Sequence, residues 1–108
     1  MGCLKKIQKE HLKWANHNFP NRKPHQPLLG ASEELGELCH AHLKEEQDIR
    51  HVTDRKAEKE DAVADTIIFL IDYCNQSDID IEKCLINTWK EVKKRDWQKN
   101  PKNGKNNK

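Results

Sequence analysis

The spacing of apolar residues is the feature of this sequence that most restricts its fold. At about 100° per residue, one arc of a helix between residues 28 and 46 collects Leu28, Ala31, Leu35, Leu38, Cys39 and His42. Three other segments repeat this spacing of three and four, and none alternates strictly. With 34% hydrophobic and 35% charged residues, buried surface must come from narrow stripes. The sequence therefore predicts an all-α domain.

Proline positions and capping residues divide the chain of 108 residues into four helices. The expected helices span residues 1–17, 28–46, 54–75 and 81–97, with Thr53 or Asp54 capping the third and Asp80 the fourth. Three prolines between Asn18 and Pro27 predict a long loop. Residues 98–108 are low in complexity and basic. We expect one helical domain over 1–97 and a disordered basic tail over 98–108.

Acidic residues border the expected core on two consecutive helices. Glu34 and Glu37 flank the apolar arc, and the next helix carries an acidic stripe of Glu58, Asp61, Asp65 and Asp72. A short connection makes the two helices antiparallel, which places Glu34 and Glu37 opposite Asp61 and Asp65. Such a stripe is either a solvated face or a metal site. All-oxygen ligands would favour Mg²⁺, with Mn²⁺ as an alternative.

Charge is distributed unevenly along the chain. The 20 basic and 18 acidic residues leave a net charge of +2, but cations crowd residues 90–95, where they could neutralise a triphosphate. The cysteines are isolated and no apolar run approaches the ~20 residues that span a membrane. We expect reduced thiols, a cytoplasmic location, no membrane partner and no nucleic-acid partner.

Two segments resemble a known family. Glu33-Glu34-Leu35-Gly36-Glu37-Leu38 is similar to the Glu-Glu-x-x-Glu signature of MazG-like nucleotide pyrophosphohydrolases, and Ala64 to Leu70 resembles the end of their second signature. With Trp14, Phe19 and Lys94-Arg95-Asp96-Trp97, the resemblance covers residues from about 10 to 97. It implies the all-α NTP pyrophosphatase fold, built like a four-helix bundle, and Mg²⁺-dependent hydrolysis of (d)NTP to (d)NMP and pyrophosphate.

The hypothesis gives each candidate residue a role. Metal binding falls to Glu34, Glu37, Asp61 and Asp65, with a metal-activated water attacking the α-phosphorus and Glu33 orienting that water or a second ion. By resemblance, phosphates would be held by Asn87, Lys90, Lys94 and Arg95, and the base would be contacted by Trp14 or Phe19. Packing in the core is the alternative for Trp14, and a hydrophobic plug in the loop is the alternative for Phe19. A solvated position is the alternative for Lys94 and Arg95.

The second signature departs from the family at one position. Ala62 stands where a glutamate is expected, and Asp61, four residues before Asp65, can substitute for it. The literal Glu-x-x-Asp spelling occurs one turn earlier, at Glu58 and Asp61. We favour Asp61 and Asp65 as the metal-binding pair of this helix. Glu58 with Asp61 is the alternative pair.

The sequence is also compatible with two other functions, and it predicts an assembly of more than one chain. One alternative is a non-enzymatic helical module that binds a protein or nucleic acid through the basic tail. Another is a related pyrophosphohydrolase acting on dUTP or on a phosphoribosylated nucleotide. The third helix is apolar over more than half its circumference, wider than one neighbouring layer covers. We therefore expect a homo-oligomer, a dimer or tetramer, built on the third and fourth helices.

Overall fold

A computed structural model describes residues 2–106, and within them all regular secondary structure is helical. The helices are α1 (Cys3–Asn18), α2 (His25–Gln47), α3 (Arg55–Gln76) and α4 (Ile81–Val92). The all-α prediction is confirmed. None of these helices is long and apolar enough to cross a membrane.

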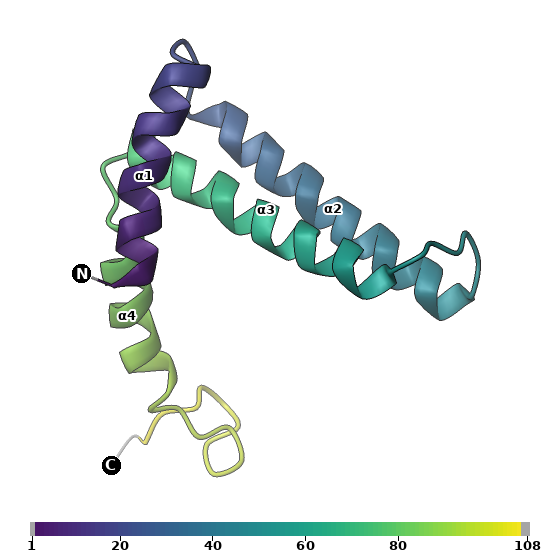
Figure 1. The fold of residues 1–108 in the computed structure, drawn as a ribbon. Helices are drawn as coiled ribbons and strands as arrows, with labels where there is room; N and C mark the ends of the chain where they lie inside the picture. The colour runs from purple at the N-terminus through teal and green to yellow at the C-terminus, as the bar shows by residue number, and fades with distance from the viewer. Residues whose placement is uncertain (1, 107–108) are drawn as a thin grey trace.

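Helices α2 and α3 form a long antiparallel hairpin, and they make the most extensive contact in the chain (Figure 1). Small residues allow the close approach, because Ala41 and Ala62 are buried and the ring of Phe69 fills the space beside Gly30. A Cβ at Gly30 would lie 2.5 Å from that ring. This packing brings the acidic positions of the two helices near each other.

The caps of α3 and α4 follow the sequence prediction. The Asp54 carboxylate accepts a hydrogen bond from the Ala57 amide at 3.0 Å, and the Asp80 carboxylate accepts one from the Lys83 amide at 3.0 Å. Each cap satisfies an amide that has no partner inside its helix.

Other helix ends differ from the prediction. Helix α2 begins at His25, so the loop covers only residues 19–24, and Pro27 lies in the first helical turn, where its missing amide hydrogen costs nothing. Helix α4 ends at Val92 rather than near Trp97. After it, the Lys94 amide donates to the Glu91 carbonyl and the Arg95 amide to the Val92 carbonyl, which are the tighter bonds of a terminating helical turn. The Asp96 amide then donates to the Gly104 carbonyl at 2.8 Å.

Residues 96–104 form a turn in the segment after α4. The Asn100 amide donates to the Asp96 backbone carbonyl, and the Gly104 amide donates to the Asn100 backbone carbonyl. Gly104 has φ of 75°, and an added Cβ would lie 2.8 Å from the Arg95 side chain. The predicted disorder over 98–108 and the domain limit at residue 97 stay predictions.

Gln8 joins three elements where α1 crosses the end of α3. Its side chain is buried, donates to the Ile79 carbonyl at 2.8 Å and accepts from the Ile81 amide at 3.1 Å. The Gln8 carbonyl accepts from the Asn75 side chain at 3.1 Å. These bonds fix the direction in which α4 leaves α3.

Replacing Gln8 by Ala is expected to lower the free energy of unfolding by about 1–3 kcal/mol, because the Ile79 carbonyl and Ile81 amide lose their partner. Urea denaturation followed by circular dichroism measures the change. The control Gln47→Ala removes an exposed glutamine at the end of α2 and should change stability by less than about 0.5 kcal/mol. Equal effects of the two substitutions would refute the role of Gln8.

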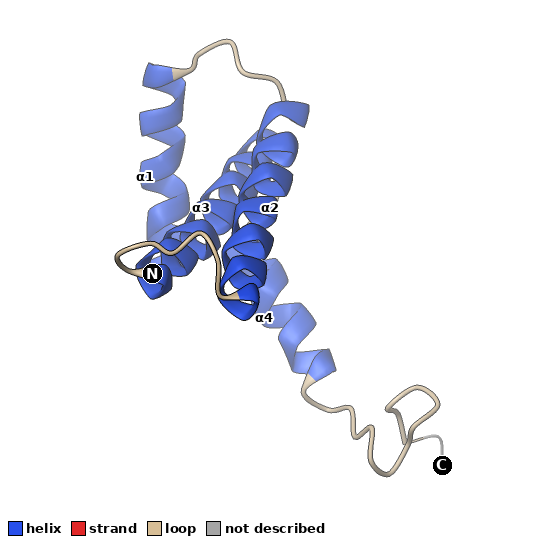
Figure 2. Ribbon diagram, turned by 90° about the vertical axis from the view of Figure 1, so that its right-hand side faces the viewer, coloured by secondary structure: helices blue, strands red, loops and turns tan. Residues whose placement is uncertain are grey.

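One chain does not close a four-helix bundle. Besides the α2–α3 hairpin, helix α1 packs on the end of α3, and α4 packs mainly against α1. The other pairs of helices make almost no contact. Figures 1 and 2 show α4 and the segment after it extending away from the hairpin. The radius of gyration is 17.8 Å, against about 13 Å for a compact chain of this length.

Much of the apolar surface predicted to be buried is exposed. Ala31 is buried and Leu38 partly so, but Leu28, Cys39 and His42 are exposed and Leu35 keeps 51% of its surface accessible. The expectation of one buried arc is wrong for the single chain. The physical reason is that α3 contacts α2 along Gly30, Ala31 and Ala41, which leaves the leucine side of α2 without a neighbour.

Candidate functional site

A hollow of about 460 Å³ lies where α1 meets the hairpin. Three helices and the loop after α1 contribute to it. Its lining consists of an acidic part and an aromatic part, made by His11, Trp14, Ala15, Phe19, Glu34, Asp65, Ile68, Phe69 and Asp72. We call it the acidic-aromatic hollow.

Carboxylates from α2 and α3 face each other in the acidic part. Glu34 is half-buried, and its pKa is raised by partial burial first and then by the negative charges of Asp65, Glu37 and Glu33. Glu34 of α2 and Asp65 of α3 both line the hollow, so the antiparallel packing of the two helices brings these carboxylates to one site. Glu33, Glu37 and Asp65 are exposed, so they can reorient toward a ligand.

Aromatic rings form the other part. The Trp14 ring lies 5.6 Å from the His11 ring and 5.8 Å from the Phe19 ring, centre to centre. Trp14 and Phe19 are exposed rather than packed in the core. Flat, accessible rings beside charged groups suit a ligand that has a planar part and a charged part.

His11 carries a polar atom without a partner. Its Nδ1 is buried and has no hydrogen bond within residues 2–106. Burial lowers the pKa of His11, and this effect exceeds the opposing attraction of Asp72. The lowered pKa favours the neutral imidazole at pH 7.

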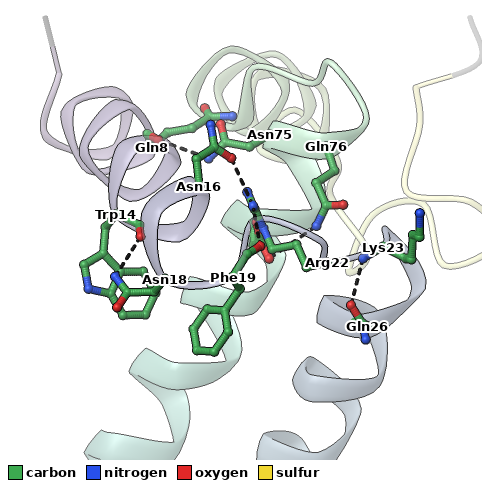
Figure 3. Close-up of polar contacts among 11 residues, drawn as sticks. Gln8, Trp14, Asn16, Asn18, Phe19, Arg22, Lys23, Gln26, Asn75 and Gln76 are labelled. Atoms are coloured by element: carbon green, nitrogen blue, oxygen red, sulfur yellow. Dashed lines mark hydrogen bonds and ion pairs between the residues drawn. The ribbon is translucent and has the colours of Figure 1, made fainter.

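An ion pair anchors the loop beside the hollow. The Arg22 Nε donates to the Asp72 carboxylate at 2.8 Å, and these side chains are only 11% and 10% exposed. Arg22 also donates to the Phe19 carbonyl at 3.2 Å and to the Asn16 side chain at 3.0 Å (Figure 3). A buried, multiply bonded guanidinium holds the loop, and therefore Phe19, close to α3.

Comparison with known proteins adds no assignment. No family model, curated protein or solved structure matches the chain.

The four expected metal ligands are only partly brought together. Glu34 and Asp65 line the same hollow, and Glu37 is close enough to raise the pKa of Glu34. Asp61 lies one turn before Asp65 on α3 and is exposed. Across residues 2–106, no three His, Cys, Asp or Glu side chains are close enough together to hold a metal ion. The structure thus presents a pair of facing carboxylates with others beside it.

The structure distinguishes Asp61 from Glu58, the alternative metal ligand on α3. Glu58 accepts a hydrogen bond from the Arg55 guanidinium at 2.9 Å, so its charge is already neutralised. Asp61 forms no ion pair with any other described residue. This difference favours Asp61 as the carboxylate available to a cation.

We expect Asp61→Asn to reduce Mg²⁺-dependent pyrophosphate release and Glu58→Gln to leave it nearly unchanged, because only Asp61 is free to meet a metal ion. Assays of the two purified variants at equal concentration give the comparison. Loss of release in Glu58→Gln together with retention in Asp61→Asn would move the ligand to Glu58.

The predicted phosphate-binding residues lie apart from the hollow. Asn87 and Lys90 are on α4, and Lys94 and Arg95 follow it. All four are exposed, and α4 packs mainly against α1. Lys94 is paired with Glu91 at 3.3 Å. In one chain these cations do not join the carboxylates.

Three features of the hollow were not predicted from the sequence: His11, Phe69 and the pairing of Arg22 with Asp72. Trp14 and Phe19 were predicted as ligand contacts, but no role was predicted for His11 or Phe69, which also line the hollow. The pairing of Arg22 with Asp72 joins residues 50 positions apart. No local pattern signals it.

Proposed function

We propose that the chain is a Mg²⁺-dependent nucleoside triphosphate pyrophosphohydrolase that converts (d)NTP and water to (d)NMP and pyrophosphate. The observation that carries the proposal is the facing of Glu34 and Asp65 at the acidic part of a hollow whose other part is aromatic. A nucleotide has the same division, because a planar base is joined to a charged phosphate chain.

The donor set fits Mg²⁺ by chemistry. Carboxylate oxygens are hard ligands, and mutual repulsion at Glu34 is relieved when a cation is shared. Mg²⁺ commonly binds one or two carboxylates and completes its shell with water and substrate phosphate, so a facing pair is sufficient. When bound, the ion supplies Lewis acidity to the phosphate oxygens and to a water. Mn²⁺ has the same ligand preference.

The residues divide into three roles in this proposal. Glu34 and Asp65 would hold the cation, Glu37 and Asp61 would complete its ligands from positions beside them, and Glu33 would orient the attacking water. The oxygen of that water would bond to the α-phosphorus as the water loses a proton to solvent. The bond from this phosphorus to the bridging oxygen would break, its electron pair would stay on that oxygen, and pyrophosphate would leave. The base lies against Trp14 and Phe19, whose exposed rings line the aromatic part. The fold would then be the all-α NTP pyrophosphatase fold.

Pyrophosphate release tests the reaction directly. The purified chain is incubated with each common ribo- and deoxyribonucleoside triphosphate, dUTP and a phosphoribosylated nucleotide, with Mg²⁺ or with a chelator. We expect monophosphate and pyrophosphate only with Mg²⁺, and the panel identifies the base and sugar. Absence of release from every nucleotide would refute the proposal.

Mg²⁺ is also expected to raise the melting temperature, since an ion that binds only the native state stabilises it. Each kcal/mol of stabilisation should add about 4–8 °C for a domain of this size. Thermal unfolding with and without millimolar Mg²⁺ measures the shift, with Ca²⁺ and Na⁺ at equal ionic strength as controls. An unchanged melting temperature would favour a non-enzymatic helical module.

We further propose a homo-oligomer of at least two chains. The chain exposes 8592 Å², roughly 2,400 Å² more than about 6,200 Å² for a compact monomer of 12.7 kDa. On α3, Val63, Ile67 and Leu70 are exposed on the side roughly opposite to Asp61 and Asp65. An excess of this size is comparable to the surface buried in obligate dimers.

A further inference from the structure

A second hollow, of about 520 Å³, lies at the C-terminal end of α4. The end of the helix and the segment that folds back onto it border this hollow, and its lining consists of Glu91, Lys94, Arg95, Gly104, Lys105 and Asn106. We call it the cationic hollow, because three cations and one acid line it. It shares no lining residue with the acidic-aromatic hollow, and this end of the chain extends away from the hairpin in both views (Figures 1 and 2).

Hydrogen bonds around Asp96 fold the segment after α4 back onto the helix end. The Asp96 carboxylate accepts from the amides of Gln98 and Lys99, each at 3.0 Å. The Asp96 amide donates to the Gly104 carbonyl at 2.8 Å. Because these bonds close a turn, cations from both ends of the segment reach one hollow.

Gly104 allows the returning segment to approach closely. Its φ of 75° lies in a region that side chains rarely adopt, and an added Cβ would lie 2.8 Å from the Arg95 side chain and 3.0 Å from the Trp97 ring. The backbone therefore passes directly beside these two side chains. The shape of the cationic hollow depends on this glycine.

Positive charge gathers in this segment with little to balance it. Residues 90–106 contain seven of the 20 basic residues of the chain and two of its 18 acids. One acid, Glu91, pairs with Lys94 at 3.3 Å, and the other, Asp96, accepts amide hydrogens in the turn. The other two cations of the hollow form no ion pair with any described residue. The hollow therefore favours a ligand that carries several negative charges.

An aromatic ring accompanies these cations. Trp97 keeps 53% of its surface accessible, and its ring lies beside Gly104 of the hollow. Bases of a single strand stack on accessible aromatic rings while cations contact the phosphates that join them. Inorganic polyphosphate would gain nothing from stacking. A membrane surface would need more apolar side chains, since Trp97 is the only large apolar residue in 93–106.

We infer that the cationic hollow binds single-stranded nucleic acid, with its cations contacting successive phosphates and Trp97 stacking on a base. The sequence led us to expect no nucleic-acid partner for a hydrolase, and to place one only in the alternative of a helical module with a basic tail. The hollow changes that expectation, because the turn gathers the cations of the tail at one place. This binding is independent of the proposed pyrophosphohydrolase reaction.

Fluorescence anisotropy of labelled oligonucleotides tests the binding on the whole chain. Single-stranded oligo(dT) and oligo(rU) of about 16 nucleotides are titrated with the purified protein at several salt concentrations. For three phosphate contacts, the logarithm of the association constant should fall against the logarithm of the salt concentration with a slope of about −2. Absence of binding at low salt would overturn the inference.

Competitors separate nucleic acid from other anionic ligands. Unlabelled oligo(dT) should displace the probe at lower concentration than inorganic polyphosphate with the same number of phosphates, and phosphatidylserine vesicles should not displace it. Trp97→Ala should weaken oligonucleotide binding by about fivefold or more and leave polyphosphate binding unchanged. Equal competition by polyphosphate, or a preference for the vesicles, would assign the hollow to another ligand.

Charge variants test whether the hollow is where the strand binds. Lys94→Ala combined with Arg95→Ala should reduce the salt slope from about −2 to about −0.7. The control combines Lys6→Ala with Lys56→Ala, which removes the same charge from exposed positions on α1 and α3 and should leave the slope unchanged. Equal losses in the two proteins would mean that net charge alone attracts the strand, which contradicts a site at the hollow.

Gly104→Ala tests the shape of the hollow at constant charge. The added Cβ would meet Arg95 and Trp97, so the turn should open and binding should weaken as far as in the double substitution at the hollow. Circular dichroism should be unchanged, because Gly104 lies outside the four helices. Undiminished binding would show that a cationic tail of any shape suffices, and would overturn the assignment to the hollow.

Discussion

Asp65→Asn, Glu34→Gln and Glu37→Gln are each expected to reduce Mg²⁺-dependent pyrophosphate release by about 100-fold or more. Each substitution deletes a carboxylate oxygen that would bind the cation or position it. Steady-state assays at saturating Mg²⁺ measure the loss. Glu46→Gln is the matched control, because Glu46 is an exposed acid near the C-terminal end of α2 and does not line the hollow. Wild-type turnover in a variant would remove that residue from the site.

The same substitutions should not unfold the protein. Glu34 is repelled by Asp65, Glu37 and Glu33, so neutralising one member relieves repulsion in the metal-free state. We expect an unchanged or higher melting temperature without Mg²⁺, and a smaller rise when Mg²⁺ is added. A variant that is inactive because it is unfolded would show a lower melting temperature in both conditions.

The pH dependence of stability follows from the raised pKa of Glu34. The native state binds the Glu34 proton more tightly than the unfolded state does, so its contribution favours folding at low pH and is lost as pH rises from the ordinary glutamate pKa through the raised one. Glu34→Gln should remove this loss of stability with rising pH. Denaturation midpoints of both proteins across this range test the sign.

Ile67→Asp is expected to separate the proposed homo-oligomer into single chains. Ile67 is 44% exposed at the centre of the uncovered apolar side of α3, and a charge placed in a buried interface has no partner there. Light scattering after gel filtration should show at least twice 12.7 kDa for the wild type and 12.7 kDa for the variant. The single chain should stay helical by circular dichroism, since the substitution is at an accessible position.

Ile49→Asp provides the control for this prediction. Ile49 is the same residue type and is also 44% exposed, but it follows α2 in the connection to α3, away from the apolar side of the hairpin. It should leave the mass of the oligomer unchanged. A wild-type mass near 12.7 kDa at micromolar concentration, with activity retained, would show that one chain suffices.

The sequence by itself determined the local structure. Helical spacing of apolar residues predicted the all-α class. Asp80 marked the start of α4, and Thr53 or Asp54 marked that of α3, where the structure shows Asp54, because periodicity and capping depend only on neighbours along the chain. The facing of Glu34 and Asp65 could also be predicted, since two antiparallel helices with a short connection have few ways to pair.

Only the tertiary structure decided which apolar residues meet a partner within the chain. Packing through Gly30, Ala41 and Ala62 left Leu35 and Ile67 exposed, although their spacing is the same as that of buried residues. It also decided that Arg22 binds Asp72 and that Gln8 directs α4 away from the carboxylates. These contacts join residues far apart in sequence, and their free energy depends on geometry that no local pattern specifies.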